Sequence, residues 1–224
     1  MGVESIFYVM PAASGFRPEP DAMAALVREL HDLRFVGSEL TWTIGQVKGK
    51  GGIDEALAAI AAEASSDICL RWQTADLAAS GLRYPLARLP GPDGVYYDLE
   101  IHLAVETAYR TSEIIQPFEE IHCACGEAIE EDWGAAGDPF AASRLPSACP
   151  ACAVPIEYAT LPMTMLDPMT GAPGSGHGGI TYRCAVVIDC GKYFPDYGTQ
   201  ADADLIAALT PVLGEDLRTV QDFY

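Results

Sequence analysis

The sequence predicts an α+β protein with a mixed or antiparallel sheet, flanking helices and an inserted four-cysteine module. Short runs of apolar, β-branched and aromatic residues alternate with segments whose apolar residues recur at helical spacing. Two tight cysteine pairs fall between the two longest strand-like runs. We therefore expect residues 1–120 and 159–224 to form one α+β domain, and residues 121–158 to form the inserted module.

The first third of the chain predicts the order strand, helix, strand, helix, strand. Its strand segments are rich in apolar, β-branched and aromatic residues, and its helical segments each carry one apolar face. Asp21 has a side chain suited to capping the first helix. In chain order, the expected elements are a strand at Ser5–Met10, a helix from Asp21 to about Leu33, a strand at Leu40–Ile44, a helix from about Asp54 to Ala64 and a strand at Ile68–Gln73.

Three other segments predict loops or irregular connections because they are rich in Gly or Pro, the residues that punctuate regular structure. They are Gly45–Gly52, Ala75–Gly94 and Asp167–Gly179.

The C-terminal part predicts a second long strand at Ile180–Asp189 and a final helix from about Ala201 to Leu213. Pro211 should bend or shorten this helix, because proline lacks a backbone N–H and clashes with the preceding turn. The tail from Leu217 to Tyr224 is expected to add an edge strand.

Residues Val95–Glu106 form the clearest strand pattern. Apolar and polar residues alternate, which places Asp98, Glu100 and His102 on one face. Such a face is typical of a half-covered antiparallel sheet that is exposed to solvent. It also supplies the groups with which an enzyme or small-ligand binder holds a metal ion or performs acid–base chemistry, so this alternative function stays open.

Charge limits the classes of partner. The chain has 32 acidic and 13 basic residues, giving a net charge of −19. A chain this acidic repels phosphate backbones and acidic membrane surfaces, so we expect no nucleic-acid and no membrane partner. No apolar run approaches the roughly 20 residues that span a bilayer, and the first residues lack a signal-peptide pattern. We expect a cytoplasmic location, where cysteines stay reduced.

Four cysteines have the spacing of a metal site. The first pair is Cys123-Ala-Cys125-Gly126 and the second is Cys149-Pro-Ala-Cys152, with 23 residues between Cys125 and Cys149. Two cysteine pairs, each on its own turn, can supply the four tetrahedral ligands of one zinc ion. Four thiolates close the coordination shell, so the predicted role of this zinc is structural, with no catalytic residue among them.

Other interpretations of these cysteines stay open. They include two disulfides, a redox-active pair at Cys149 and Cys152, and a site in which His122 replaces one cysteine.

The two cysteine pairs resemble the zinc-ribbon group of small four-cysteine modules, although the first pair is C-x-C rather than C-x-x-C. The rest of the chain resembles bacterial proteins that carry such a ribbon. The resemblance implies structural zinc and a local β-hairpin, with no particular activity. From Pro117 to Tyr158 there are eight acidic residues and one basic residue, Arg144. We therefore expect a non-enzymatic zinc protein that binds a protein partner or self-associates.

Overall fold

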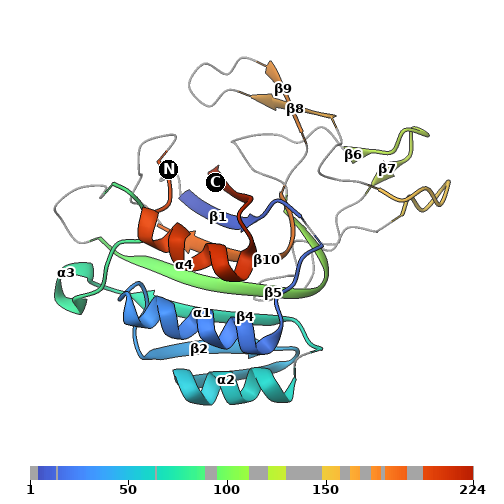
Figure 1. Cartoon of the computed structure of the whole chain (residues 1–224). Coiled ribbons are helices and arrows are strands. Elements are labelled where there is room, and N and C mark those ends of the chain that lie inside the picture. The colour runs from blue at the N-terminus through green and yellow to red at the C-terminus, as the bar shows by residue number, and fades with distance from the viewer. Residues whose placement is uncertain are drawn as a thin grey trace. The chain divides into compact units, whose positions relative to one another are not determined.

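The structure is a computed structural model of the whole chain (Figure 1). It divides into two compact units. The sheet unit comprises Met1–Glu106 and Tyr182–Gln221, and the cysteine unit comprises Thr107–Thr181 and Asp222–Tyr224. The residues that the structure describes are 5–13, 15–63, 65–88, 95–110, 121–129, 148–156, 162–166, 173–177, 180–190 and 199–223. The predicted module boundaries at residues 121 and 158 stay a prediction.

A seven-stranded sheet dominates the fold and confirms the predicted α+β class. Its strand order is β11-β1-β10-β5-β4-β2-β3. The pairs β1–β10, β2–β3, β2–β4 and β4–β5 are all antiparallel. The strands are β1 (Ser5–Pro11), β2 (Glu39–Ile44), β3 (Val47–Gly52), β4 (Ile68–Thr74), β5 (Tyr97–Arg110), β10 (Ile180–Asp189) and β11 (Leu217–Phe223).

Three helices cover one face of this sheet: α1 (Pro20–Asp32), α2 (Ile53–Ala62) and α4 (Ala203–Leu213) (Figure 1). Helix α1 contacts both of the others. Its N-cap is Glu19 rather than the predicted Asp21, because Pro20 occupies the first helical position, where its missing N–H removes no hydrogen bond. Pro211 lies inside α4 but does not shorten it, because the helix continues to its expected end at Leu213.

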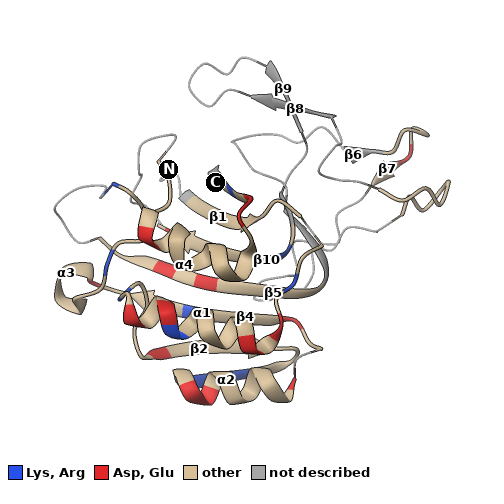
Figure 2. Cartoon of the chain, in the orientation of Figure 1, with Lys and Arg blue, Asp and Glu red and all other residues tan. Residues whose placement is uncertain are grey.

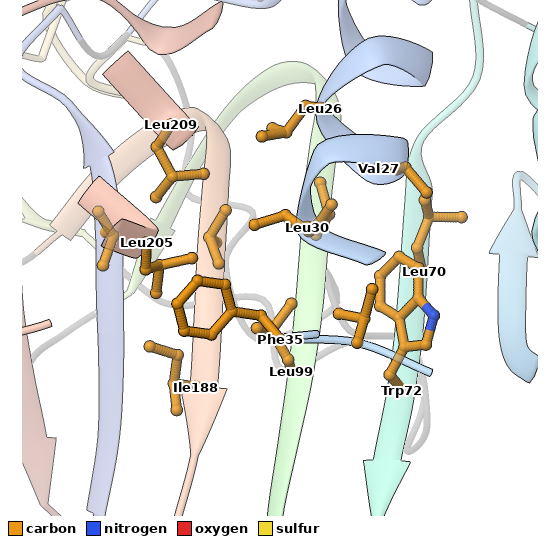
Figure 3. Packing of buried hydrophobic residues seen from close by; sticks show 14 of the residues in the cluster. Leu26, Val27, Leu30, Phe35, Leu70, Trp72, Leu99, Ile188, Leu205 and Leu209 are labelled. Carbon is orange, nitrogen blue, oxygen red and sulfur yellow. The ribbon is translucent and has the colours of Figure 1, made fainter. Parts of the chain in front are cut away.

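The core lies between the helices and the sheet. Leu26, Val27 and Leu30 of α1 meet buried side chains of β4 and β5, and Leu205 and Leu209 of α4 lie over Ile188 of β10 (Figure 3). The largest fully buried side chains of this cluster include Phe7, Phe35, Trp72 and Tyr97. The predicted apolar faces of the helices are therefore confirmed. No helix of the described residues is both long enough and apolar enough to cross a membrane.

The loop predicted at Gly45–Gly52 is wrong, because most of it is strand β3. Val47–Gly52 pairs antiparallel with β2, and Gly45 makes the connecting turn with a φ of +55°. Glycine normally weakens a strand, but here Gly49 lies directly opposite Trp42, whose indole ring covers it. The indole ring of Trp42 thus occupies the space that a side chain at position 49 would need.

Replacing Gly49 with Ala should destabilise this edge of the sheet. The new Cβ would lie 2.2 Å from Cε2 of Trp42, so the indole or the strand must move. We expect the free energy of unfolding in urea to fall by about 1–3 kcal/mol, the range for overpacking. Gly37→Ala is the control, because a Cβ there meets nothing within 4 Å, and it should change stability by less than about 0.5 kcal/mol. Equal stability of the two variants would contradict this interpretation.

Two other predicted loops contain regular structure. Within Ala75–Gly94, Leu77–Ser80 forms the short helix α3, capped by the Asp76 carboxylate, which accepts from the Ala79 N–H. Within Asp167–Gly179, β9 (Pro173–His177) pairs antiparallel with β8 (Pro162–Leu166) in the cysteine unit. Composition misses β9 because backbone pairing can hold a Gly-rich, Pro-containing segment in a strand when a partner strand is present.

Candidate metal centre

The first cysteine pair lies on a tight turn between two short strands. β6 (Ile121–His122) pairs antiparallel with β7 (Ala128–Ile129). Inside this hairpin, the Gly126 N–H donates to the Cys123 carbonyl at 2.8 Å, and the Cys123 N–H donates to the Glu127 carbonyl at 2.9 Å. Gly126 adopts a φ of +92°, which favours glycine. The turn thus directs Cys123 and Cys125 toward a common point.

The second cysteine pair lies on a similar turn. The Ala153 N–H donates to the Cys149 carbonyl and the Cys149 N–H donates to the Val154 carbonyl, both at 2.9 Å. A β-bridge between Ala148 and Pro155 closes the turn. Ala153 has a φ of +58°, a left-handed conformation that is strained for a residue with a Cβ. This strain indicates that the surrounding turn fixes the backbone at this position.

The two turns bring the four sulfurs together. Cys123 Sγ lies 3.7 Å from Cys152 Sγ, and Cys125 Sγ lies 3.6 Å from Cys149 Sγ. All four sulfurs lie within 4.8 Å of one another. These separations are far longer than the roughly 2.05 Å of an S–S bond, and all four thiols are free. The four cysteines are therefore positioned to bind a metal ion rather than paired as disulfides.

The environment of Cys149 favours the form that binds metal. Burial opposes ionisation, but backbone N–H groups of Cys152 and Ala151 donate to its sulfur, and its pKa falls to about 7. A backbone hydrogen bond from Glu127 lowers the pKa of Cys125, but hydrogen bonds shared with the neighbouring thiols outweigh it and raise the pKa to about 12. A thiolate is the metal ligand. The environment of Cys149 thus favours the thiolate, whereas a cation would have to displace the thiol proton of Cys125.

Gly126 and Ala153 both have a positive φ, and substituting them should have opposite effects on the apparent affinity for Zn²⁺. Gly126→Ala should place a Cβ in a conformation that costs about 1–2 kcal/mol, although a Cβ there meets no atom within 4 Å. Because metal binding includes ordering of the turn, the apparent affinity for Zn²⁺ should fall about 5–30-fold. Ala153→Gly should leave it unchanged or raise it. Competition with a chromophoric chelator measures both, and weaker binding by Ala153→Gly alone would contradict the assignment of strain.

The structure describes the backbone of His122 and part of the surface around the four cysteines. His122 lies in β6, but its side chain falls outside the described residues, as does Arg144. Cys123 and Cys149 are buried, whereas Cys125 and Cys152 are exposed. Val154, next to this exposed edge, is an exposed apolar side chain.

The polar face predicted on β5 is not exposed to solvent as expected for a half-covered sheet. Asp98 and His102 are buried, and Glu100 is largely so (acidic segments of β5 in Figure 2). The register places Cys69 opposite His102 and Arg71 opposite Glu100. The solvent-face interpretation is therefore wrong, because burial of a strand face depends on what packs over it, which alternation cannot reveal.

A network of polar contacts connects this face. His102 Nε2 lies 2.6 Å from Glu100 Oε2, and Cys69 Sγ lies 3.7 Å from the same oxygen. Arg71 binds Asp98 and also lies 3.3 Å from Glu100 Oε1. Burial alone would raise the pKa of Glu100, but the hydrogen bond and charge of His102, with Arg71, lower it below its ordinary value. The predicted residues Asp98, Glu100 and His102 therefore do converge.

Sequence reasoning missed the contribution of neighbouring strands to this face. Tyr182 of β10 places its hydroxyl 3.1 Å from His102 Nδ1. Cys184 belongs to the hydrophobic core cluster, whereas the sulfur of Cys69 lies beside the Glu100 carboxylate. The alternation Cys69-Leu70-Arg71-Trp72-Gln73 in β4 indicates one polar face, but only the pairing register shows which β5 residues that face meets.

The comparisons with known proteins give no relative: no family model matches the chain, and neither a curated protein nor a solved structure matches it.

Proposed function

We propose that Cys123, Cys125, Cys149 and Cys152 bind one structural Zn²⁺ in a zinc-ribbon module, and that this module serves a cytoplasmic protein–protein interaction or adaptor function. The observation that carries the zinc proposal is the convergence of the four free sulfurs from two turns.

The sulfur separations match a tetrahedral zinc site. With Zn–S bonds of about 2.3 Å, the sulfurs of a regular tetrahedron lie about 3.8 Å apart. The separations of 3.6 and 3.7 Å are therefore close to the required edges before any ion is added. Thiolates also favour zinc over hard cations such as Mg²⁺ and Ca²⁺.

A structural role follows from the ligand set. Catalytic zinc keeps one coordination position for water or substrate, whereas four thiolates fill a tetrahedral shell. The ion would then act by holding two turns together that are separated by a spacer of 23 residues. Because the site is absent from an unfolded chain, its binding free energy contributes directly to folding of the module.

The interaction proposal is supported by the exposed edge of the four-cysteine cluster. Cys125, Cys152 and the apolar Val154 are exposed there, and Glu127 adds an exposed acid. An apolar residue held rigidly in an acidic setting favours a partner with apolar and basic groups. The same acidity disfavours nucleic acid, since each acidic side chain repels phosphate.

Size-exclusion chromatography with light scattering, followed by affinity capture with quantitative mass spectrometry, tests the interaction. We expect wild-type protein to self-associate or to retain a defined partner, and Val154→Glu to lose it while keeping its zinc. Val47→Glu is the matched control, because Val47 is also exposed but lies in the sheet unit. A wild-type monomer that enriches no protein over Val154→Glu would overturn the proposal.

A further inference from the structure

We propose a second, independent metal site in the sheet unit, in which Cys69 Sγ, Glu100 Oε2 and His102 Nε2 bind one divalent transition-metal ion of the zinc type. We call these residues the sheet cluster. It does not depend on the four-cysteine cluster or on the function proposed for it.

Two adjacent strands bring the sheet cluster together. Cys69 of β4 lies directly opposite His102 of β5 in the antiparallel register. Glu100 precedes His102 by two residues and so projects from the same face of β5. The three ligand atoms lie within 4.8 Å of one another. Neighbouring positions on one face of a regular sheet are among the most rigid places from which a protein can present ligands.

The distances fit an ion after a small adjustment. In a tetrahedral zinc site, sulfur and oxygen ligands lie about 3.6 Å apart, and nitrogen and oxygen ligands about 3.3 Å apart. Cys69 Sγ and Glu100 Oε2 are already 3.7 Å apart. His102 Nε2 and Glu100 Oε2, at 2.6 Å, share a proton that the ion would replace. Binding therefore needs a separation of these two atoms by about 0.7 Å, which rotation of the carboxylate can supply.

The surrounding side chains hold each ligand as second-layer partners do in metal sites. The hydroxyl of Tyr182 lies 3.1 Å from His102 Nδ1, the ring nitrogen that a metal-binding histidine commonly uses for a supporting hydrogen bond. Arg71 contacts Glu100 Oε1, which leaves Oε2 directed at the other two ligands. Asp98 in turn holds Arg71. These contacts support Glu100 and His102 from behind.

Metal binding also has a proton balance. The thiol proton of Cys69 leaves to solvent, and the proton between His102 Nε2 and Glu100 Oε2 is displaced, so that a thiolate, a ring nitrogen and a carboxylate oxygen face the ion. A buried carboxylate or thiolate is favourable only when it is paired or coordinates a metal, and the ion meets that condition.

The ligand chemistry distinguishes this site from the four-cysteine cluster. A mixed set of one thiolate, one imidazole and one carboxylate resembles the three-ligand sets of catalytic zinc, whereas four thiolates resemble structural zinc. The sheet cluster should therefore differ from the four-cysteine cluster in its affinity for zinc and in the absorption spectrum of bound Co²⁺.

Cobalt titration of the purified full chain under reducing conditions tests the proposal. After chelator treatment, wild type should bind two equivalents of Co²⁺. The double variant Cys125→Ser/Cys152→Ser should keep one, with sulfur-to-cobalt charge-transfer absorbance roughly one quarter of that of a four-thiolate site, because one thiolate replaces four. Adding Cys69→Ser or His102→Gln to the double variant should abolish this equivalent. Adding Cys184→Ala, which changes a buried cysteine of the core cluster in the same sheet unit, should leave it.

Two results would overturn the proposal. One is folded wild-type protein that binds no Co²⁺, or a single equivalent with the absorbance of a four-thiolate site; this result requires no variant. The other is retention of the second equivalent with an unchanged spectrum in both Cys69→Ser and His102→Gln. Circular dichroism of each metal-free variant shows whether a loss reflects the ligand or the fold; if the variants unfold, the wild-type stoichiometry decides.

Discussion

Replacing Cys149 with Ser should release the proposed zinc ion and unfold the cysteine unit while the sheet unit stays folded. Cys149 is buried, and its sulfur lies 3.6 Å from that of Cys125, so its loss removes one of four ligands and the residue best suited to ionise. Structural zinc in small modules is worth about 10–16 kcal/mol of apparent binding free energy. Loss of a thiolate should therefore weaken zinc affinity by several orders of magnitude.

Elemental analysis and hydrogen exchange with mass spectrometry measure this effect separately in the two units. We expect loss of the zinc at this site and loss of amide protection around β6 and β7, with protection of β4 and β5 unchanged. Cys190→Ser is the control, since Cys190 is a buried cysteine of the sheet unit that accepts a hydrogen bond from the Tyr84 hydroxyl. Wild-type protein that purifies metal-free, with its four cluster thiols open to alkylation, would contradict the zinc proposal.

Replacing Leu99 with Ala should destabilise the sheet unit and leave the cysteine unit folded. Leu99 is fully buried on β5 and belongs to the same core cluster as Phe35 (Figure 3). Truncating a buried leucine costs about 2–5 kcal/mol, because apolar contacts are lost and a cavity remains. We expect the sheet unit to unfold at lower urea concentration, with the zinc content of the four-cysteine cluster unchanged below that transition.

Leu33→Ala provides the comparison for this prediction. Leu33 is a partly buried leucine at the end of α1, and its truncation should cost clearly less than that of Leu99. If Leu99→Ala released zinc in native buffer, the stabilities of the two units would be coupled. The expectation that the sheet unit and the cysteine unit unfold independently would then be wrong.

Most of the regular structure could be predicted from local patterns. The apolar spacing of α1, α2 and α4 and the dense apolar runs of β1, β4 and β10 carry their own periodicity, so these elements are where the sequence places them. β3 could not be predicted, because a run of lysine and glycine has no strand propensity. It becomes a strand through pairing with β2 and through the fit of Gly49 beneath Trp42.

The two candidate sites also differ in how much of each could be predicted from the sequence. Spacing in the chain marked Cys123, Cys125, Cys149 and Cys152, because each pair sits on a turn that local sequence specifies. Spacing also marked Glu100 and His102, but nothing local joined them to Cys69 or Tyr182. Those residues arrive on neighbouring strands through long-range pairing.

The sequence by itself determined the α+β class, the helices and most strands, and the two cysteine turns, since each depends on interactions between residues close in the chain. Tertiary structure alone decided that the four sulfurs lie within 4.8 Å of one another and that the polar face of β5 is buried. It also decided that this face gains a thiol and a hydroxyl from adjacent strands. The physical reason is that alternation tells which residues share a face, whereas register and packing determine what that face meets.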